Sequence, residues 1–215
     1  MKKQKLLIYA LIFGILGYSL YKYLYPTTPL KLHQTGNNIL TVVLLRHGEK
    51  PNMGLGNLDC QGLNRAVALP SVLFQKFGKP HYIFAPNPNV KIYEGGLSFN
   101  YIRPLITIAP TAIKNELSVD TTYAYDEYEN LNNKLKNAAY ANSTVFIAWE
   151  HAKLVELAKL LMKTYKGNPN KIPDWSDNDY DTLFVFKIER PLNSPTGRIT
   201  FTVDSEGLNG MSSEC

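Results

Sequence analysis

Residues 40–52 read LTVVLLRHGEKPN, an apolar, β-branched run that stops at Arg46-His47-Gly48-Glu49. A short apolar run between polar residues is typical of a buried strand. Arg46 and His47 would then lie at the carboxyl end of that strand, the edge where open α/β sheets bind ligands. The guanidinium group of arginine binds phosphate oxygens through two parallel hydrogen bonds, and the imidazole group of histidine is a nucleophile near neutral pH. The stretch therefore indicates phosphate chemistry, although an isolated RHG tripeptide is also found at ordinary solvent-exposed strand ends.

A second histidine, His151, follows residues 144–149 (TVFIAW), another predicted strand. If the two strands are parallel neighbours, His47 and His151 meet at one edge of the sheet. Arg103 lies in the first turn of a helix expected over 98–111, where free backbone N–H groups and the helix dipole favour an anion. Each residue alone is a weak signal, but together they predict a pocket that neutralises a phosphoryl group from several sides.

Strand and helix patterns alternate along the chain. Predicted strands are 40–45, 81–85, 144–149, 182–188 and 198–203, with a short strand or extended loop at 120–125, and predicted helices are 58–77, 98–111, 126–139 and 153–165. Asp59 is the expected N-cap of the first helix, Gly78 follows its end, and residues 86–96 are expected to form a loop. The alternation predicts an α/β domain, a three-layer α/β/α sandwich with a mostly parallel central sheet.

The composition suits one globular domain with an appendage: 215 residues, of which 45% are hydrophobic. The net charge of +5 is concentrated before Glu49, the first acidic residue, so nucleic acid is not an expected partner. The two cysteines, Cys60 and Cys215, are too few for a disulfide framework and wrongly spaced for a zinc site. A disulfide between them is not expected, because Cys215 lies in a Gly/Ser-containing tail.

Residues 6–20 (LLIYALIFGILGYSL) carry no charge and follow a lysine cluster. Extended to about Tyr25, the segment approaches the roughly 20 residues that a membrane-spanning helix needs. No small-residue cleavage motif follows, which favours a single-pass, uncleaved signal anchor with the domain on the extracytoplasmic side; cleavage would make the protein secreted. The expected organisation is a transmembrane or signal segment at 1–25, a linker at 26–38, the domain at 39–205 and a flexible tail at 206–215.

These motifs resemble those of the histidine phosphatase superfamily, which has the phosphoglycerate-mutase-like fold. The segment Arg46-His47-Gly48-Glu49 matches its RHG signature, and residues 58–66 (LDCQGLNRA) look like its L-[ST]-x-x-G-x-x-x-A helix start. Residues 103–107 (RPLIT) are similar to the R-A-x-x-T segment that carries the second phosphate arginine, and His151 matches the second pocket histidine. The resemblance covers about residues 40–160.

By this resemblance the protein would be a phosphatase that hydrolyses phosphate monoesters through a phosphohistidine on His47, with no metal or other cofactor. Arg46, Arg103 and His151 would bind the transferred phosphoryl group, and Asn52 is a further candidate for substrate binding. The expected partner is a small phosphorylated substrate or a phosphoprotein. The alternative is a catalytically weak or inactive domain that binds phosphorylated ligands; a mutase is less expected, since its phosphorylated cofactor would be lacking outside the cytoplasm.

The proton donor to the leaving oxygen is open among three carboxylates. In mutase-like members a glutamate follows the helix of the second arginine, and Glu127 stands at the similar place, although acidic residues there are also common at a solvated helix start. Asp126 is its neighbour. Glu150 precedes His151 where the family usually has serine, so its carboxylate either repels phosphate or donates a proton. We favour Glu127 as the acid and expect Glu150 to contact the substrate.

Overall fold

The centre of the structure is a sheet that contains the RHG strand. The computed structural model describes residues 38–191 and 197–215. Its strands are β1 (Asn38–Arg46), β2 (Tyr82–Phe84), β3 (Lys91–Glu94), β4 (Leu97–Asn100), β5 (Val119–Asp120), β6 (Thr144–Trp149), β7 (Thr182–Arg190) and β8 (Arg198–Ser205). Its helices are α2 (Cys60–Phe77), α3 (Arg103–Lys114), α4 (Tyr128–Leu135) and α5 (His151–Thr164), with 3-10 turns at Ala138–Tyr140 and Pro169–Lys171.

The main sheet has six strands in the order β5-β2-β6-β1-β7-β8. The strands β5, β2, β6 and β1 are parallel to their neighbours, whereas β7 runs antiparallel to both β1 and β8. Only β7 therefore runs against the other strands of this sheet, and the predicted mostly parallel central sheet is confirmed.

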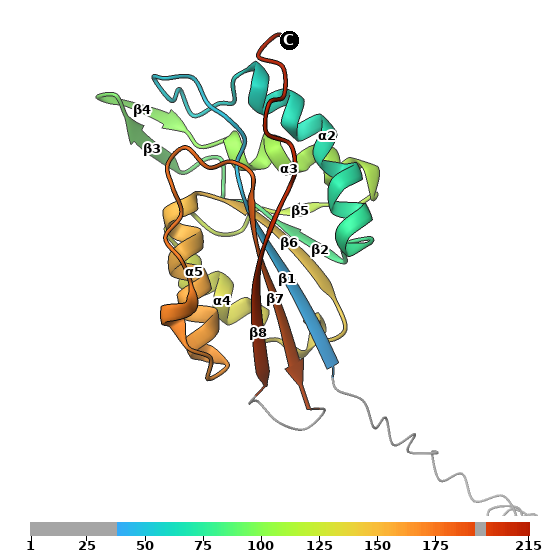
Figure 1. Ribbon diagram of the computed structural model, residues 1–215. Helices are drawn as coiled ribbons and strands as arrows, with labels where there is room; N and C mark the ends of the chain where they lie inside the picture. The colour runs from blue at the N-terminus through green and yellow to red at the C-terminus, as the bar shows by residue number, and fades with distance from the viewer. Residues whose placement is uncertain (1–37, 192–196) are drawn as a thin grey trace, which may run out of the picture. The chain divides into compact units, whose positions relative to one another are not determined.

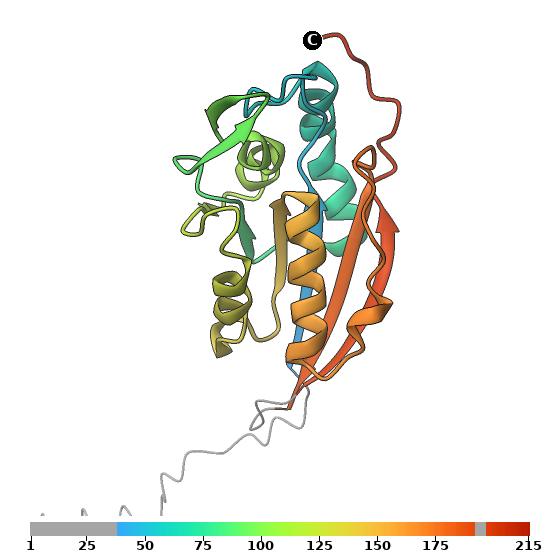
Figure 2. The same cartoon turned by 90° about the vertical axis from the view of Figure 1, so that its left-hand side faces the viewer.

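The alternation of side chains along β1 explains the three layers. Val42 and Leu44 pack in the core that α4 and α5 complete, while Val43 and Leu45 pack in the core beneath α2 and α3. A strand buried on both faces reads as a continuous apolar run, as residues 40–45 do. Figures 1 and 2 show α4 and α5 on one side of the sheet and α2 and α3 on the other. The predicted α/β/α sandwich is thus observed.

A hairpin replaces part of the expected loop and the expected start of a helix. Strands β3 and β4 form a separate antiparallel pair, in which Ile92 faces Phe99 and Glu94 faces Leu97. Gly95 and Gly96 connect the strands with φ of 57° and 82°. Positive φ at both residues suits the turn that matches hairpin twist, and glycine adopts it without steric cost. The helix α3 consequently begins at Arg103 rather than at residue 98.

The C-terminal tail is held against α2, contrary to the expectation of a flexible segment. Cys60 and Cys215 form a disulfide, so the expectation of no bridge is wrong. Asn64 Nδ2 donates hydrogen bonds to the carbonyls of Ser212 (2.9 Å) and Glu214 (2.8 Å). Figure 1 shows the end of the chain beside α2. The disulfide thereby closes a covalent loop from the start of α2 to the C-terminus, and β1 with the RHG segment lies outside this loop.

The expected membrane segment at 1–25 and residues 26–37 of the expected linker lie outside the described residues. In the part of the chain that the structure describes, no helix has both the length and the apolar character to cross a membrane. Residue Asn38, the last of the expected linker, already belongs to β1.

Candidate active site

The RHG segment and the second histidine lie at the ends of neighbouring strands. Strands β1 and β6 are parallel, and Arg46 is the register partner of Trp149, the last residue of β6. The pairing extends one step further, because His47 N–H donates to the carbonyl of Trp149 (3.1 Å). His47 and the Glu150-His151 pair therefore emerge at the same edge of the sheet, as the sequence predicted.

A pocket of about 410 Å³ opens at this edge. It is lined by six of the residues predicted from the sequence, namely Arg46, His47, Asn52, Arg103, Glu150 and His151. It is also lined by residues that the sequence analysis did not single out, including Lys50, Glu94, Asp177, Asn178 and Tyr180. Glu127 and Asp126 are not among its lining residues. Basic and acidic side chains thus share one polar pocket.

The side chain of His47 is buried and held in one tautomer. Its Nδ1 lies 2.7 Å from the carbonyl oxygen of Gly48. A carbonyl can only accept, so Nδ1 carries the proton and Nε2 keeps its lone pair. Burial, reinforced by the charges of Arg103 and Arg46, holds the pKa of His47 well below 6.5. The imidazole is therefore neutral at pH 7 and has a free nucleophilic nitrogen.

The backbone of Gly48 ties the RHG loop to two helices. Its N–H donates to Thr107 Oγ1 (2.9 Å), and the Thr107 hydroxyl donates to the carbonyl of Arg103 one turn earlier in α3 (2.9 Å). A Cβ at residue 48 would lie 2.9 Å from the backbone of Gly62 in α2. That separation is too short for a side chain, so glycine is required where the loop meets the helix.

Arg46 lies at the pocket wall formed by the 176–180 segment. Its Nη1 donates to the carbonyls of Asp177 (2.6 Å) and Asp179 (3.0 Å), and its guanidinium carbon lies 4.0 Å from the centre of the Tyr180 ring. Burial lowers the pKa of Arg46, but a guanidinium stays protonated in proteins. Its Nε is buried and has no hydrogen-bond partner. Arg46 thus supplies a fixed positive charge next to His47.

Arg103 begins α3 and faces a carboxylate from the β3–β4 hairpin. Its Nη1 and Nη2 donate to the two oxygens of Glu94, at 2.7 and 2.9 Å. Lys50 Nζ lies 3.4 Å from the same carboxylate. Burial raises the pKa of Glu94, but the hydrogen bonds and charges of Arg103 and Lys50 outweigh it and leave the pKa below its ordinary value. In this structure Glu94 occupies the donors that the prediction assigned to phosphate.

Glu150 caps the helix that carries His151. Its carboxylate accepts hydrogen bonds from the N–H groups of Ala152 (3.0 Å) and Lys153 (2.8 Å) at the start of α5. Burial alone would raise the pKa of Glu150, but these bonds and His151 outweigh it and lower the pKa to about 2. Glu150 is therefore a carboxylate at neutral pH and holds no proton to donate.

The imidazole of His151 lies between two carboxylates. Its Nδ1 is 2.7 Å from Glu150 Oε1, and its Nε2 is 2.6 Å from Asp177 Oδ1. Glu150 and His151 can both face the pocket because the chain turns from β6 into α5 between them. One nitrogen of His151, Nε2, is thus occupied by Asp177 in this structure.

Glu127, the favoured proton donor, is not brought to the pocket. It is exposed, stands at the N-cap of α4, and accepts hydrogen bonds from Ala124 N–H (2.8 Å) and Asn130 Nδ2 (3.0 Å). Asp126 beside it is also exposed. This carboxylate organises a helix start, the role that acidic residues there commonly have. Sequence reasoning missed two carboxylates of the pocket, Glu94 and Asp177. For Glu94, the Gly95-Gly96 pair between two short alternating segments is the signal that could have placed it.

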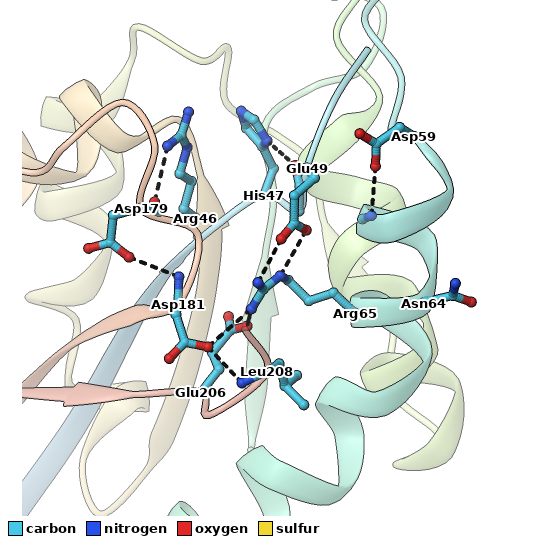
Figure 3. A network of polar contacts seen from close by, with 12 residues as sticks. Arg46, His47, Glu49, Asp59, Asn64, Arg65, Asp179, Asp181, Glu206 and Leu208 are labelled. Carbon is cyan, nitrogen blue, oxygen red and sulfur yellow. Dashed lines mark hydrogen bonds and ion pairs between the residues drawn. The ribbon is translucent and has the colours of Figure 1, made fainter. Parts of the chain in front are cut away.

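A buried ion network lies behind the RHG loop (Figure 3). Arg65 of α2 donates two hydrogen bonds to Glu49, at 2.9 and 2.7 Å. Its Nη1 contacts Glu206 at 2.6 Å and Asp181 at 3.3 Å. Asp181 also accepts from the N–H of Leu208 (2.7 Å). The network links the residue after Gly48 to the start of the tail. Among the described residues, this network included, there is no group of three or more His, Cys, Asp or Glu side chains able to hold a metal ion.

The sequence matches no protein-family model and no curated protein. The structure, however, resembles solved structures. A mycobacterial hydrolase, named hydrolase 2, has a TM-score of 0.52 and 12% identity over 76% of this chain and 89% of its own. A mycobacterial glucosyl-3-phosphoglycerate phosphatase in complex with inorganic phosphate has a TM-score of 0.52 and 13% identity over 76% of this chain and 95% of its own. A protein from Nakamurella multipartitia that is named as the phosphohistidine phosphatase SixA has a TM-score of 0.50 and 14% identity over 79% of this chain and 97% of its own.

Proposed function

Because the chain has the fold of the histidine phosphatase superfamily, we propose that it is a phosphatase that hydrolyses phosphate monoesters through a phosphohistidine on His47. The observation that carries the proposal is the buried, neutral imidazole of His47, whose Nδ1 donates to a carbonyl and whose pKa is lowered by burial and by the charges of Arg103 and Arg46. A nucleophile in this state attacks without first losing a proton.

The reaction has two displacements at phosphorus. In the first, His47 Nε2 forms a bond to phosphorus while the bond to the ester oxygen breaks. In the second, water attacks phosphorus and the nitrogen–phosphorus bond breaks, which releases phosphate and restores neutral His47. Arg46 and Arg103 neutralise charge on the phosphoryl oxygens in both steps. For Arg103 to do so, Glu94 must leave its guanidinium.

A second candidate is a domain that binds phosphorylated ligands without turnover. It is favoured by the carboxylates of Glu94 and Asp177, which lie on Arg103 and His151 and raise the negative charge of the pocket. Turnover by the natural sequence separates the candidates, because a binding domain would retain a phosphorylated ligand intact. In either case we propose a small phosphorylated compound, or a phosphorylated protein side chain, as the ligand.

We also propose that the domain acts on the extracytoplasmic side of a membrane and is attached through residues 6–20. The Cys60–Cys215 disulfide supports this location, because such bonds persist in oxidising compartments. Removal of residues 1–25 should then move the protein from the membrane pellet to the soluble fraction. A mature natural N-terminus near Pro26 would instead show a cleaved signal and a secreted protein.

The deciding experiment is hydrolysis of p-nitrophenyl phosphate in the presence of a chelator by three forms of the protein. The natural sequence and His81→Asn, which alters a histidine at the opposite end of β6, should be active, whereas His47→Ala should lose at least about 10³-fold. Rapid quenching with a labelled substrate in alkaline denaturant should trap phosphate that is stable to base and labile to acid. Activity of His47→Ala within a few-fold of the natural protein would exclude the phosphohistidine mechanism.

A further inference from the structure

The carboxylate of Glu94 stands where a phosphate group would bind Arg103. Its two oxygens accept one hydrogen bond each from Nη1 and Nη2, the two-pronged geometry that guanidinium also forms with phosphate. Glu94 is the last residue of β3, next to the Gly95-Gly96 turn of a hairpin outside the main sheet. The contact therefore joins the first residue of α3 to the β3–β4 hairpin, which is not part of the main sheet.

A substrate phosphate and Glu94 cannot both accept hydrogen bonds from Nη1 and Nη2 of Arg103 in this two-pronged geometry. When phosphate takes these donors, Glu94 loses two charge-assisted hydrogen bonds and remains in the pocket beside a dianion. Both changes favour the protonated carboxylic acid, because the two hydrogen bonds from Arg103 are lost and a like charge is gained, while Lys50 Nζ, 3.4 Å away, remains the one cation beside Glu94. The Glu94 carboxyl, whose pKa the hydrogen bonds and charges of Arg103 and Lys50 lower in the free protein against the opposing effect of burial, should therefore bind a proton more readily once substrate occupies Arg103.

The other carboxylates are less suited to donate a proton. Glu150 accepts two backbone hydrogen bonds at the start of α5, and these bonds do not depend on whether substrate is present. Glu127 is outside the pocket and is bonded to Ala124 and Asn130. Asp177 lines the pocket, but its side chain is 90% exposed and lies on His151. Asp177 is accordingly the rival that an experiment must separate from Glu94.

We propose that Glu94 is the proton donor to the leaving oxygen and that the substrate itself releases it from Arg103. This inference rests on the proposed phosphatase function. On binding, phosphate displaces Glu94, which takes one proton from solvent. As His47 Nε2 bonds to phosphorus and the ester bond breaks, that proton passes to the ester oxygen and the alcohol leaves. In the second step, the attacking water gives a proton to the Glu94 carboxylate. When phosphate leaves and Glu94 binds Arg103 again, Glu94 returns this proton to solvent, so the cycle balances.

The test is Glu94→Gln in the full chain. The comparison variants are Asp177→Asn and Glu127→Gln, which likewise replace a carboxylate by an uncharged amide. Each is assayed with p-nitrophenyl phosphate, whose leaving group needs no proton, and with a simple alkyl phosphate. Proton donation contributes about 10²–10⁴-fold. The aryl-to-alkyl ratio of kcat/KM should therefore rise about 10²-fold or more in Glu94→Gln and stay unchanged in the two comparison variants. Inhibition by inorganic phosphate should also tighten in Glu94→Gln, since Arg103 no longer binds a competing carboxylate.

Equal loss on both substrates in Glu94→Gln, or no loss on either, would overturn the inference. A ratio that rises only in Asp177→Asn would assign the acid to Asp177 and would overturn it as well. These outcomes differ from failure of the proposed function, in which the natural sequence hydrolyses neither substrate and forms no phosphohistidine. Thermal unfolding of Glu94→Gln identifies a misfolded variant, for which Glu94→Ala replaces it with the same expected ratio.

Discussion

Arg65 Nη1 lies 2.6 Å from Glu206 Oε2, and both side chains are fully shielded from solvent. The same guanidinium contacts Glu49 and Asp181, so three carboxylates surround a single buried positive charge. Negative charge in excess of its partner is costly in a low-dielectric interior. Glu206 relieves that cost by holding a proton, and burial raises its pKa to about 8. Arg65 thereby joins Glu49, the residue after Gly48, to Glu206 at the start of the tail, and Glu206 is the group that titrates (Figure 3).

The raised pKa of Glu206 predicts that the protein loses stability as the pH rises. Between the ordinary glutamate pKa in the unfolded chain and about 8 in the folded one, the folded state binds more protons. The stabilisation is complete below the unfolded pKa and is lost as the pH rises toward 8, by at most about 1.4 kcal/mol per pH unit. Denaturant unfolding at pH 5, 6, 7 and 8 measures the slope. Glu206→Gln should flatten it, and an unchanged slope would assign the titration to another group.

The disulfide predicts a stability difference between oxidised and reduced protein. Cys60 and Cys215 are separated by 155 residues, so the bond restricts almost the entire domain in the unfolded state. Loss of such a cross-link typically costs about 2–4 kcal/mol. The Cys60→Ser/Cys215→Ser double variant should lower the unfolding free energy by that amount, measured in urea without reductant. As the matched check, the natural protein should lose the same unfolding free energy when reductant is added. Identical urea unfolding curves for the double variant and the oxidised natural protein would contradict the prediction.

Most of the fold followed from hydrophobic patterns that the structure preserves. β1 and β6 are apolar because both their faces are buried, and Asp59 caps α2 through a 2.8 Å bond to Gly62 N–H as its position before an apolar-periodic run indicated. Arg103 was assigned correctly to the first turn of a helix because Pro104 suits that position. These features depend on nearby residues, which a sequence displays directly.

The features that were missed depend on contacts between distant segments. Nothing near Cys215 indicates that it reaches Cys60, since the tail is placed by Asn64 and by the Arg65 network. Glu94 reaches Arg103 only because the hairpin folds back over the start of α3, and Glu127 faces away because its carboxylate closes a turn on Asn130. The ranking of the carboxylates as proton donors, with Glu127 first, therefore did not match their positions, because it was made without knowledge of their partners.

The two-pronged contact of Arg103 predicts that lysine cannot replace it. Arg103→Lys keeps the charge but loses the planar fork that binds two oxygens. We expect inhibition by vanadate to weaken and kcat/KM to fall by about 10²-fold, the range seen when one transition-state donor is lost. Lys114→Arg, a change at the far end of the same helix, is the control. Unchanged vanadate inhibition in Arg103→Lys would show that Arg103 does not bind the phosphoryl group.

Glu150 has two separable roles, and the last prediction distinguishes them. Its carboxylate caps α5 through Ala152 and Lys153, and it also places a negative charge beside the phosphate-binding groups. Serine is an uncharged residue that caps helices well, whereas alanine is uncharged and caps them poorly. Glu150→Ser should therefore keep most of the stability and bind inorganic phosphate more tightly. Glu150→Ala should bind phosphate more tightly as well but lose about 1 kcal/mol of unfolding free energy.

Calorimetric phosphate titration and urea unfolding of both Glu150 variants measure the two roles independently. Because the pKa of Glu150 is lowered to about 2, its charge is present throughout the neutral range, so the gain in phosphate affinity should be the same at pH 6 and pH 8 once phosphate ionisation is accounted for. Unchanged phosphate affinity in both variants would mean that the carboxylate serves the helix alone. Weaker phosphate binding in both would show instead that Glu150 acts on the ligand through His151, whose Nδ1 lies 2.7 Å away.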